Sequence, residues 1–157
     1  MSIRAILKIE KLQKDLKEKY TINQSEMEKI AEDMANKIKV RTRLGYDVDR
    51  SKLPPIKSEK YKKKRANYKK KGKLSDQTTP GRSNLTFTGQ LLDSLYGKSY
   101  ANNTFTIELK EKRDNESVTN SEVTIYQELQ NRIYFGFSDA EKKYLLRKII
   151  DIFLRKG

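Results

Sequence analysis

A tract of basic residues interleaved with two tyrosines carries the strongest charge signal in the sequence. Its basic members are Lys62, Lys63, Lys64, Arg65, Lys69, Lys70, Lys71 and Lys73, and Tyr61 and Tyr68 lie among them. Lysine neutralises phosphates, and tyrosine stacks on bases or on arginine. Because lysine far outnumbers arginine, the tract favours non-specific charge contacts over bidentate recognition of bases. Contact with nucleic acid, docking on another protein and a solvated loop are the three alternatives.

Residues that could perform catalysis are scarce. The chain has no cysteine and no histidine, which removes disulfides, thiolate sites and the commonest general base and metal ligand. Asp47 with Asp49, or Asp114 with Glu116, could hold Mg²⁺, but turn chemistry explains both pairs better. Residues 72–81 lack the spacing of a phosphate-binding loop. We therefore expect a protein that is not an enzyme and that needs no metal and no cofactor.

The excess positive charge is concentrated in one segment. The 157 residues, a length typical of a single domain, include 35 basic and 21 acidic residues. From Arg41 to Ser83 there are 15 basic residues and 4 acidic ones. Such a balance favours an anionic partner. No apolar run approaches the ~20 residues that cross a bilayer. The first residues are charged too early for a signal peptide, so we expect a cytoplasmic chain without a membrane partner.

The first forty residues predict two helices. The apolar stripe of the first consists of Ile6, Ile9, Leu12 and Leu16, and that of the second consists of Met27, Ile30, Met34 and Ile38. Ser25 would cap the second helix with Glu28 as its capping-box partner, and Gly45 would end it. We expect the two stripes to form an antiparallel helix pair or to pack on a sheet, with a helix dedicated to a partner as the alternative.

The segment 41–84 shows no periodicity and contains all three prolines of the chain. This composition predicts a long basic extended loop or arm, because so few apolar residues cannot offset the entropy of ordering. A loop of this length is uncommon in a compact domain unless it has a function. We expect neighbouring subunits to hold it in place.

The chain becomes apolar again directly after this segment. Thr88 and Gly89 would make a tight turn and start a short helix over residues 90–96, with leucines 91, 92 and 95 facing inward. Residues 104–110 alternate like a half-buried strand, and 111–117 have the chemistry of a hairpin turn. Residues 121–129 and 132–137 would add two further strands. Ser138 would cap a final helix with Glu141 as its capping-box partner.

These elements predict an α+β fold. It would consist of two N-terminal helices, a long basic loop, a short helix and a small antiparallel sheet with a C-terminal helix packed on it, all in a single domain over residues 1–157. An open edge of so thin a sheet is a natural place for another chain to add a strand.

Two stretches give the sequence a family resemblance. The stretch "LTFTGQLLDSL" at 85–95, followed by the expected hairpin and by "RIYFGFSDAEKKYLLRKIIDIFL" at 132–154, resembles the tail-completion (virion morphogenesis, minor tail protein) family of tailed bacteriophages. A glycine and a proline that family members often carry before the arginine are replaced here by "QELQN". The matching positions are Leu85, Thr86, Thr88, Gly89, Leu91, Ser94, Arg132, Phe135, Gly136, Phe137, Ser138 and Asp139.

The resemblance implies a structural protein of the phage neck. Such a protein would form a homo-oligomeric ring, six- or twelve-fold, between the portal or adaptor and the tail tube, with DNA passing through the lumen of the virion's head-tail interface. Thr88, Gly89, Leu91, Ser94, Arg132, Phe135 and Gly136 would then be structural motif residues, and the Lys/Tyr tract would contact DNA or a neighbouring subunit. The alternative function is a free protein that binds nucleic acid non-specifically through that tract.

Overall fold

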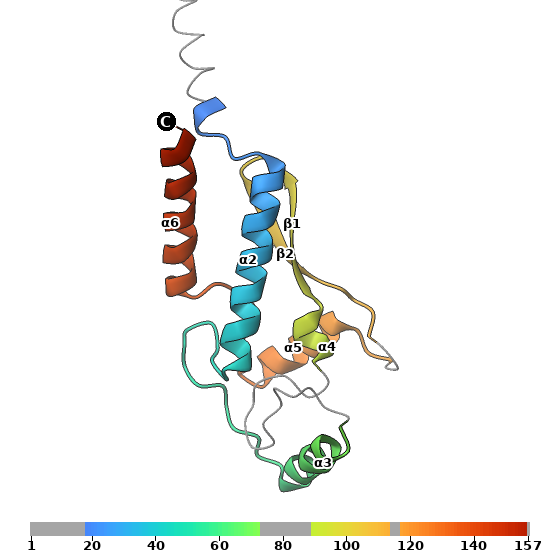
Figure 1. The fold of residues 1–157 in the computed structure, drawn as a ribbon. Helices are drawn as coiled ribbons and strands as arrows, with labels where there is room; N and C mark the ends of the chain where they lie inside the picture. Colours follow the sequence, from blue (N-terminus) through green and yellow to red (C-terminus); the bar gives the residue numbers. More distant parts are fainter. Residues whose placement is uncertain (1–17, 73–88, 114–116, 157) are drawn as a thin grey trace, which may run out of the picture.

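The computed structural model describes residues 18–72, 89–113 and 117–156, and within them it shows an α+β fold (Figure 1). The predicted fold class is therefore confirmed. In chain order the elements are α2 (Gln24–Arg43), α3 (Glu59–Lys70), α4 (Gln90–Asp93), β1 (Leu95–Ala101), β2 (Thr104–Leu109), α5 (Asn120–Leu129) and α6 (Asp139–Lys156). The first expected helix, with its stripe from Ile6 to Leu16, lies outside the described residues. None of the described helices is long and apolar enough to cross a membrane.

Helix α2 is the central element of the core. It lies along the hairpin of β1 and β2, with α6 beside it (Figure 1). Its predicted stripe is buried throughout. The helix begins two residues earlier than expected, because Asn23 accepts a hydrogen bond of 2.9 Å from the backbone N–H of Glu26, and the Glu26 carboxylate accepts in return from Asn23. The capping box predicted at Ser25 and Glu28 is therefore wrong. Gly45 follows the helix in a left-handed conformation, as expected of a helix stop.

The sheet has two strands where three were expected. β1 pairs with β2 in antiparallel register, with Leu95 opposite Leu109 and Gly97 opposite Ile107. Gly97 lies against the backbone of α2: a Cβ built there would stand 2.0 Å from the carbonyl carbon of Ala31. The helix therefore packs on the strand with no room for a side chain between them.

Two strand predictions and one helix boundary are wrong. The predicted strand at 121–129 is helix α5, whose start is fixed by a capping box between Thr119 and Glu122. Residues 132–137 form no strand, and the partner of β2 is β1, which precedes it in the sequence. The short helix predicted over 90–96 ends at Asp93, because the chain enters β1 at Leu95.

The segment 41–84, predicted to be a long basic extended loop or arm, contains helix α3. Ser58 caps it by accepting a hydrogen bond of 3.2 Å from the backbone N–H of Tyr61. The lysines, glutamate and alanine that follow have good intrinsic helix propensity, and the Ser58 cap and the burial of Arg65 add to it where the apolar pattern is absent. Leu53 and Ile56 are buried just before it. Residues 73–84 lie outside the described residues.

The capping box predicted for the last helix is confirmed. Ser138 donates its backbone N–H to Glu141 at 2.7 Å, and its hydroxyl accepts from the Glu141 backbone N–H at 3.3 Å. Helix α6 then shares one core cluster with α2 and β2. Its apolar members include Met27, Ile30, Met34, Phe105, Ile107, Leu145, Ile149, Ile152 and Phe153.

Candidate interaction surfaces

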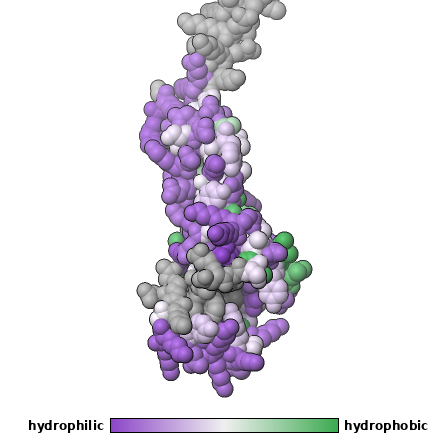
Figure 2. All heavy atoms as spheres, turned by 90° about the vertical axis from the view of Figure 1, so that its right-hand side faces the viewer, coloured by the Kyte–Doolittle hydropathy of each residue, from purple (hydrophilic) through white to green (hydrophobic). Residues whose placement is uncertain are grey.

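Most of the predicted basic tract lies on α3, at one end of the molecule (Figure 1). The space-filling view in Figure 2 shows hydrophilic residues over this end. The exposed lysines of the helix and its C-cap are Lys60, Lys63, Lys64, Lys69, Lys70 and Lys71, while Lys62 is half-buried and bound to Glu59 at 2.5 Å. Lys73 lies outside the described residues. Six ammonium groups on an exposed helix and its cap form a surface that attracts phosphates or carboxylates without reading a sequence.

Arg65 differs from the lysines around it. Only 3% of it is exposed, so its guanidinium is not part of the solvent-facing charge. It lies 5.8 Å from the centroid of the Tyr61 ring, and Lys64 lies 5.6 Å from that of Tyr68. The tyrosines of the tract therefore contact cations of their own helix, which is the intramolecular use of a cation–π pair.

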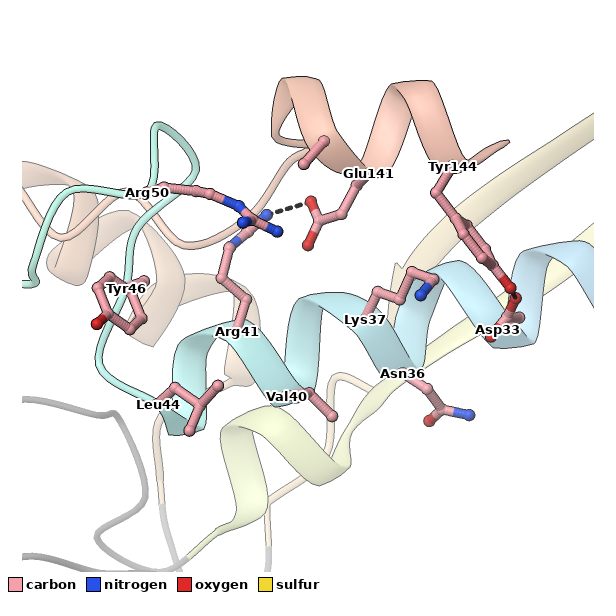
Figure 3. Close-up of a pocket in the computed structure, with 11 residues that line it drawn as sticks. Asp33, Asn36, Lys37, Val40, Arg41, Leu44, Tyr46, Arg50, Glu141 and Tyr144 are labelled. Atoms are coloured by element: carbon pink, nitrogen blue, oxygen red, sulfur yellow. Dashed lines mark hydrogen bonds and ion pairs between the residues drawn. The ribbon is translucent and has the colours of Figure 1, made fainter. Parts of the chain in front are cut away.

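A pocket of about 710 Å³ lies between α2, the loop after it and the start of α6 (Figure 3). It is lined by Asp33, Asn36, Lys37, Val40, Arg41, Leu44, Tyr46, Arg50, Ala140, Glu141 and Tyr144. The contributing segments are distant in sequence, and no sequence pattern indicated that they would meet. The part of the chain that the structure describes holds no group of three acidic residues that could bind a metal there or elsewhere.

A buried ion pair closes one end of this pocket. The guanidinium of Arg41 donates to the Glu141 carboxylate, to the carbonyl oxygen of Tyr134 and, at 3.1 Å, to that of Gly136. The two side chains are 6% and 5% exposed. Burial lowers the pKa of Arg41 from its usual value, and the charge of Glu141 opposes this shift. Arg41 follows Ile38 by three residues and lies on the same buried face of α2. An arginine that continues an apolar stripe is the sequence signal from which a buried arginine could have been predicted.

At the other end of the pocket, Asp33 connects α2 to α6. Its carboxylate accepts from the Tyr144 hydroxyl at 2.7 Å and binds the Lys148 ammonium. Burial raises the pKa of Asp33, but the hydrogen bonds from Lys148 and Tyr144 outweigh it and hold that pKa below its ordinary value. Lys37 lies 3.6 Å above the Tyr144 ring. The carboxylates of the pocket are thus engaged within the chain.

Exposed apolar side chains gather on two further helices. On α5 they are Ile125, Tyr126 and Leu129, and on α6 they are Leu146, Ile150 and Leu154, one per turn. Leu129 is 75% exposed and Leu154 is 73% exposed. In Figure 2 the face shown is largely hydrophilic, with hydrophobic residues at one edge, level with α5. Exposed apolar side chains that recur along one face of a helix are candidates for a contact with another molecule.

The residues of the two resemblance stretches meet in the core. Leu91, Leu92, Leu95 and Tyr134 belong to one buried cluster, against which Phe135 and Phe137 pack. This cluster joins the stretch at 85–95 to the stretch at 132–154.

Each remaining motif residue has a local structural role. Gly89 takes a φ of 81° at the start of α4, where a left-handed residue is needed. Ser94 donates its hydroxyl to the carbonyl oxygen of Leu91 at 2.7 Å, and Arg132 donates to the Gln127 side chain at 3.3 Å. Gly136 offers its carbonyl oxygen to Arg41. Thr88 lies outside the described residues.

Comparisons with protein-family models, with curated proteins and with solved structures find no match for this chain.

Proposed function

We propose that this protein is a structural subunit of the head-tail neck of a tailed bacteriophage. It would assemble into a homo-oligomeric ring that completes the tail or joins it to the portal or adaptor, with the tail tube as a further partner and DNA passing through the lumen. The observation that carries the proposal is the apolar surface left exposed on α5 and α6. A single chain gains nothing from that surface, whereas contacts between copies would bury it.

Two other observations support the same proposal. The two stretches that resemble the tail-completion family share one core cluster, as parts of a common fold would. The lysine-rich face of α3 supplies positive charge for contact with DNA that passes through a channel or with an acidic neighbouring protein. A role of this kind requires shape and charge and no reacting group.

The oligomeric state of the purified chain tests the proposal directly. We expect light scattering to give a mass of several copies, and electron microscopy to show closed rings. A chain that stays monomeric at every concentration and binds DNA or RNA with strong salt dependence would favour the second candidate, a free non-specific nucleic-acid-binding protein. The exposed lysines of α3 are the observation that favours this second candidate.

Substitution of the α3 lysines separates DNA contact from assembly. The variant changes five exposed lysines to glutamine, at Lys60, Lys63, Lys64, Lys69 and Lys70. We expect rings of unchanged mass and weaker DNA binding with a shallower salt dependence, because each lost phosphate contact removes about one released counterion. A matched control changes five exposed lysines outside α3, at Lys29, Lys110, Lys112, Lys142 and Lys143. Loss of the ring in the α3 variant alone would show that α3 docks on protein.

A further inference from the structure

The rim of the pocket beside α2 combines apolar groups with uncompensated positive charge. Val40 and Leu44 are exposed on successive turns of α2 and its cap, and Tyr46 follows them in the loop. Arg50, from the loop that follows α2, also lines the pocket, and its side chain extends toward the Arg41–Glu141 pair (Figure 3). Its guanidinium makes no hydrogen bond or ion pair with any residue that the structure describes.

The acidic groups of the pocket do not neutralise this rim. Glu141 is paired with Arg41, and Asp33 is bound by Lys148. Lys37 lies over the Tyr144 ring, a neutral partner. The pocket therefore presents apolar groups at its rim together with Arg50, a cation that has no ion pair among the described residues, which suits a ligand that is apolar and negatively charged.

Helix α5 has the complementary properties. Its outer face exposes Ile125, Tyr126 and Leu129, and its ten residues include two glutamates and no lysine or arginine. Glu122 also serves the capping box, through its bond to the Thr119 backbone N–H. Glu128 is exposed next to Leu129, and its carboxylate makes no hydrogen bond or ion pair with the residues that the structure describes. The last turn of α5 thus carries an apolar group and a free carboxylate side by side.

We propose that α5 of one copy of this chain docks in the pocket beside α2 of the next copy. Leu129 and Tyr126 would cover Val40 and Leu44, and Glu128 would meet Arg50. This is a helix laid in a groove, with charge complementarity setting its orientation. Because the two surfaces share no residue, the contact can repeat head to tail, and it builds a ring where the rotation between successive copies closes. The inference rests on the proposed homo-oligomer and names the contact that would build it.

Disulfide trapping tests the pairing, because the chain has no cysteine of its own. One preparation carries Leu44→Cys and a second, differently tagged preparation carries Leu129→Cys. We expect oxidation of the mixture to link the two tagged chains. In the matched control, Leu154→Cys replaces Leu129→Cys, since Leu154 is equally exposed on α6. We expect at least tenfold less linkage there, because a head-to-tail contact through α5 leaves residue 154 away from the pocket.

A charge exchange tests the orientation independently. We expect Arg50→Glu to weaken assembly by about tenfold or more, and Glu128→Lys to restore it in the double variant. Lys57→Glu makes the same change in net charge at an exposed position outside both surfaces and should leave assembly unchanged. Circular dichroism of each variant confirms that it folds.

The outcomes separate this inference from the proposed ring. If residue 44 links equally to residues 129 and 154 in a protein that still forms rings, the docking of α5 is overturned and the proposed ring is not. A wild-type chain that stays monomeric, together with Leu44→Cys and Leu129→Cys preparations that give no 44–129 linkage, overturns both. Selective linkage with rescue by the double variant supports both.

Discussion

Removing the charge of Glu141 while keeping its shape is the sharpest test of how the pocket is held together. In Glu141→Gln the amide oxygen can still accept from Ser138, which the carboxylate does at 2.7 Å. The guanidinium of Arg41 keeps its bonds to the carbonyl oxygens of Tyr134 and Gly136. What disappears is the counter-charge of an arginine that is only 6% exposed. The substitution therefore isolates the electrostatic part of the pair.

The expected cost follows from this geometry. Breaking a buried ion pair by removing one partner costs about 3–5 kcal/mol, because a buried charge is left uncompensated. Two carbonyl oxygens still solvate Arg41, so we place Glu141→Gln at the lower end, about 3 kcal/mol. Removing both charges, in Arg41→Met with Glu141→Leu, should cost less than the sum of the two single variants, since no charge is then left without a partner.

Urea unfolding followed by far-UV circular dichroism measures these differences, at one fixed protein concentration because assembly adds to stability. Asp139→Asn is the matched control: it makes the same carboxylate-to-amide change in the first turn of α6, where Asp139 is 90% exposed and pairs with Lys142 at 3.2 Å. We expect a change within about 0.5 kcal/mol there. A Glu141→Gln variant as stable as Asp139→Asn would refute the argument that the buried pair joins α6 to α2.

Two further predictions concern the packing of α2. Gly97→Ala should lower the free energy of unfolding by about 3 kcal/mol or prevent folding, because its Cβ would stand 2.0 Å from the Ala31 backbone. Differential scanning calorimetry checks this, and Ala101→Ser in the same strand is the control. The pKa of Asp33 is lowered in the folded state. The ionised Asp33 therefore contributes about 1 kcal/mol to the free energy of unfolding above about pH 4, and this contribution is lost as the pH falls below that value. In acid titrations of stability, Asp33→Asn should therefore start lower than wild type and show a smaller decline, and identical curves would contradict the role of the Asp33–Lys148 pair.

The elements that could be predicted from the sequence are those whose signals are local. The apolar stripe of α2 recurs every three or four residues and faces the core, as periodicity requires. The capping box of Ser138 and Glu141 lies within four residues and forms as predicted. The alternation around Phe105 and Ile107 gave β2 for the same reason.

Helix α5 was mistaken for a strand because three of its four apolar residues, Ile125, Tyr126 and Leu129, do not face the core, and only Val123 packs against it. Its buried residues are Asn120 and Thr124, both polar, and their hydrogen bonds replace apolar contacts: Asn120 donates to the Lys110 carbonyl oxygen at 2.6 Å. Thr124 and the Tyr134 hydroxyl lie 2.7 Å apart. The apolar periodicity of this segment belongs to the outer face of the helix, which we propose to be an interface. An error of this kind is expected wherever function, and not folding, selects the apolar residues.

Strand β1 was missed for a related reason. Only Leu95 and Ser99 of its seven residues are buried, and the Ser99 hydroxyl donates to the carbonyl oxygens of Ala101 and Thr104. Gly97 is required by the approach of α2 and carries no pattern of its own. A strand stabilised by a close backbone contact and a serine hydroxyl has no apolar alternation for sequence reasoning to detect.

The position of α3 connects the proposed contact between copies to the basic tract. The helix carries seven basic residues and one acidic residue, and it shares no residue with α5 or with the pocket, so docking of α5 would leave it free. In a ring the symmetry would repeat α3 at the same end of every subunit. The lysines of neighbouring copies would then repel one another over distances within about 10 Å at moderate ionic strength. Such an accumulation of charge is costly by itself and becomes favourable only next to an anionic surface. If the copies assemble as proposed, the charge of α3 would favour a polyanion or an acidic protein face at that end, and the lysine variants would identify which of the two it is.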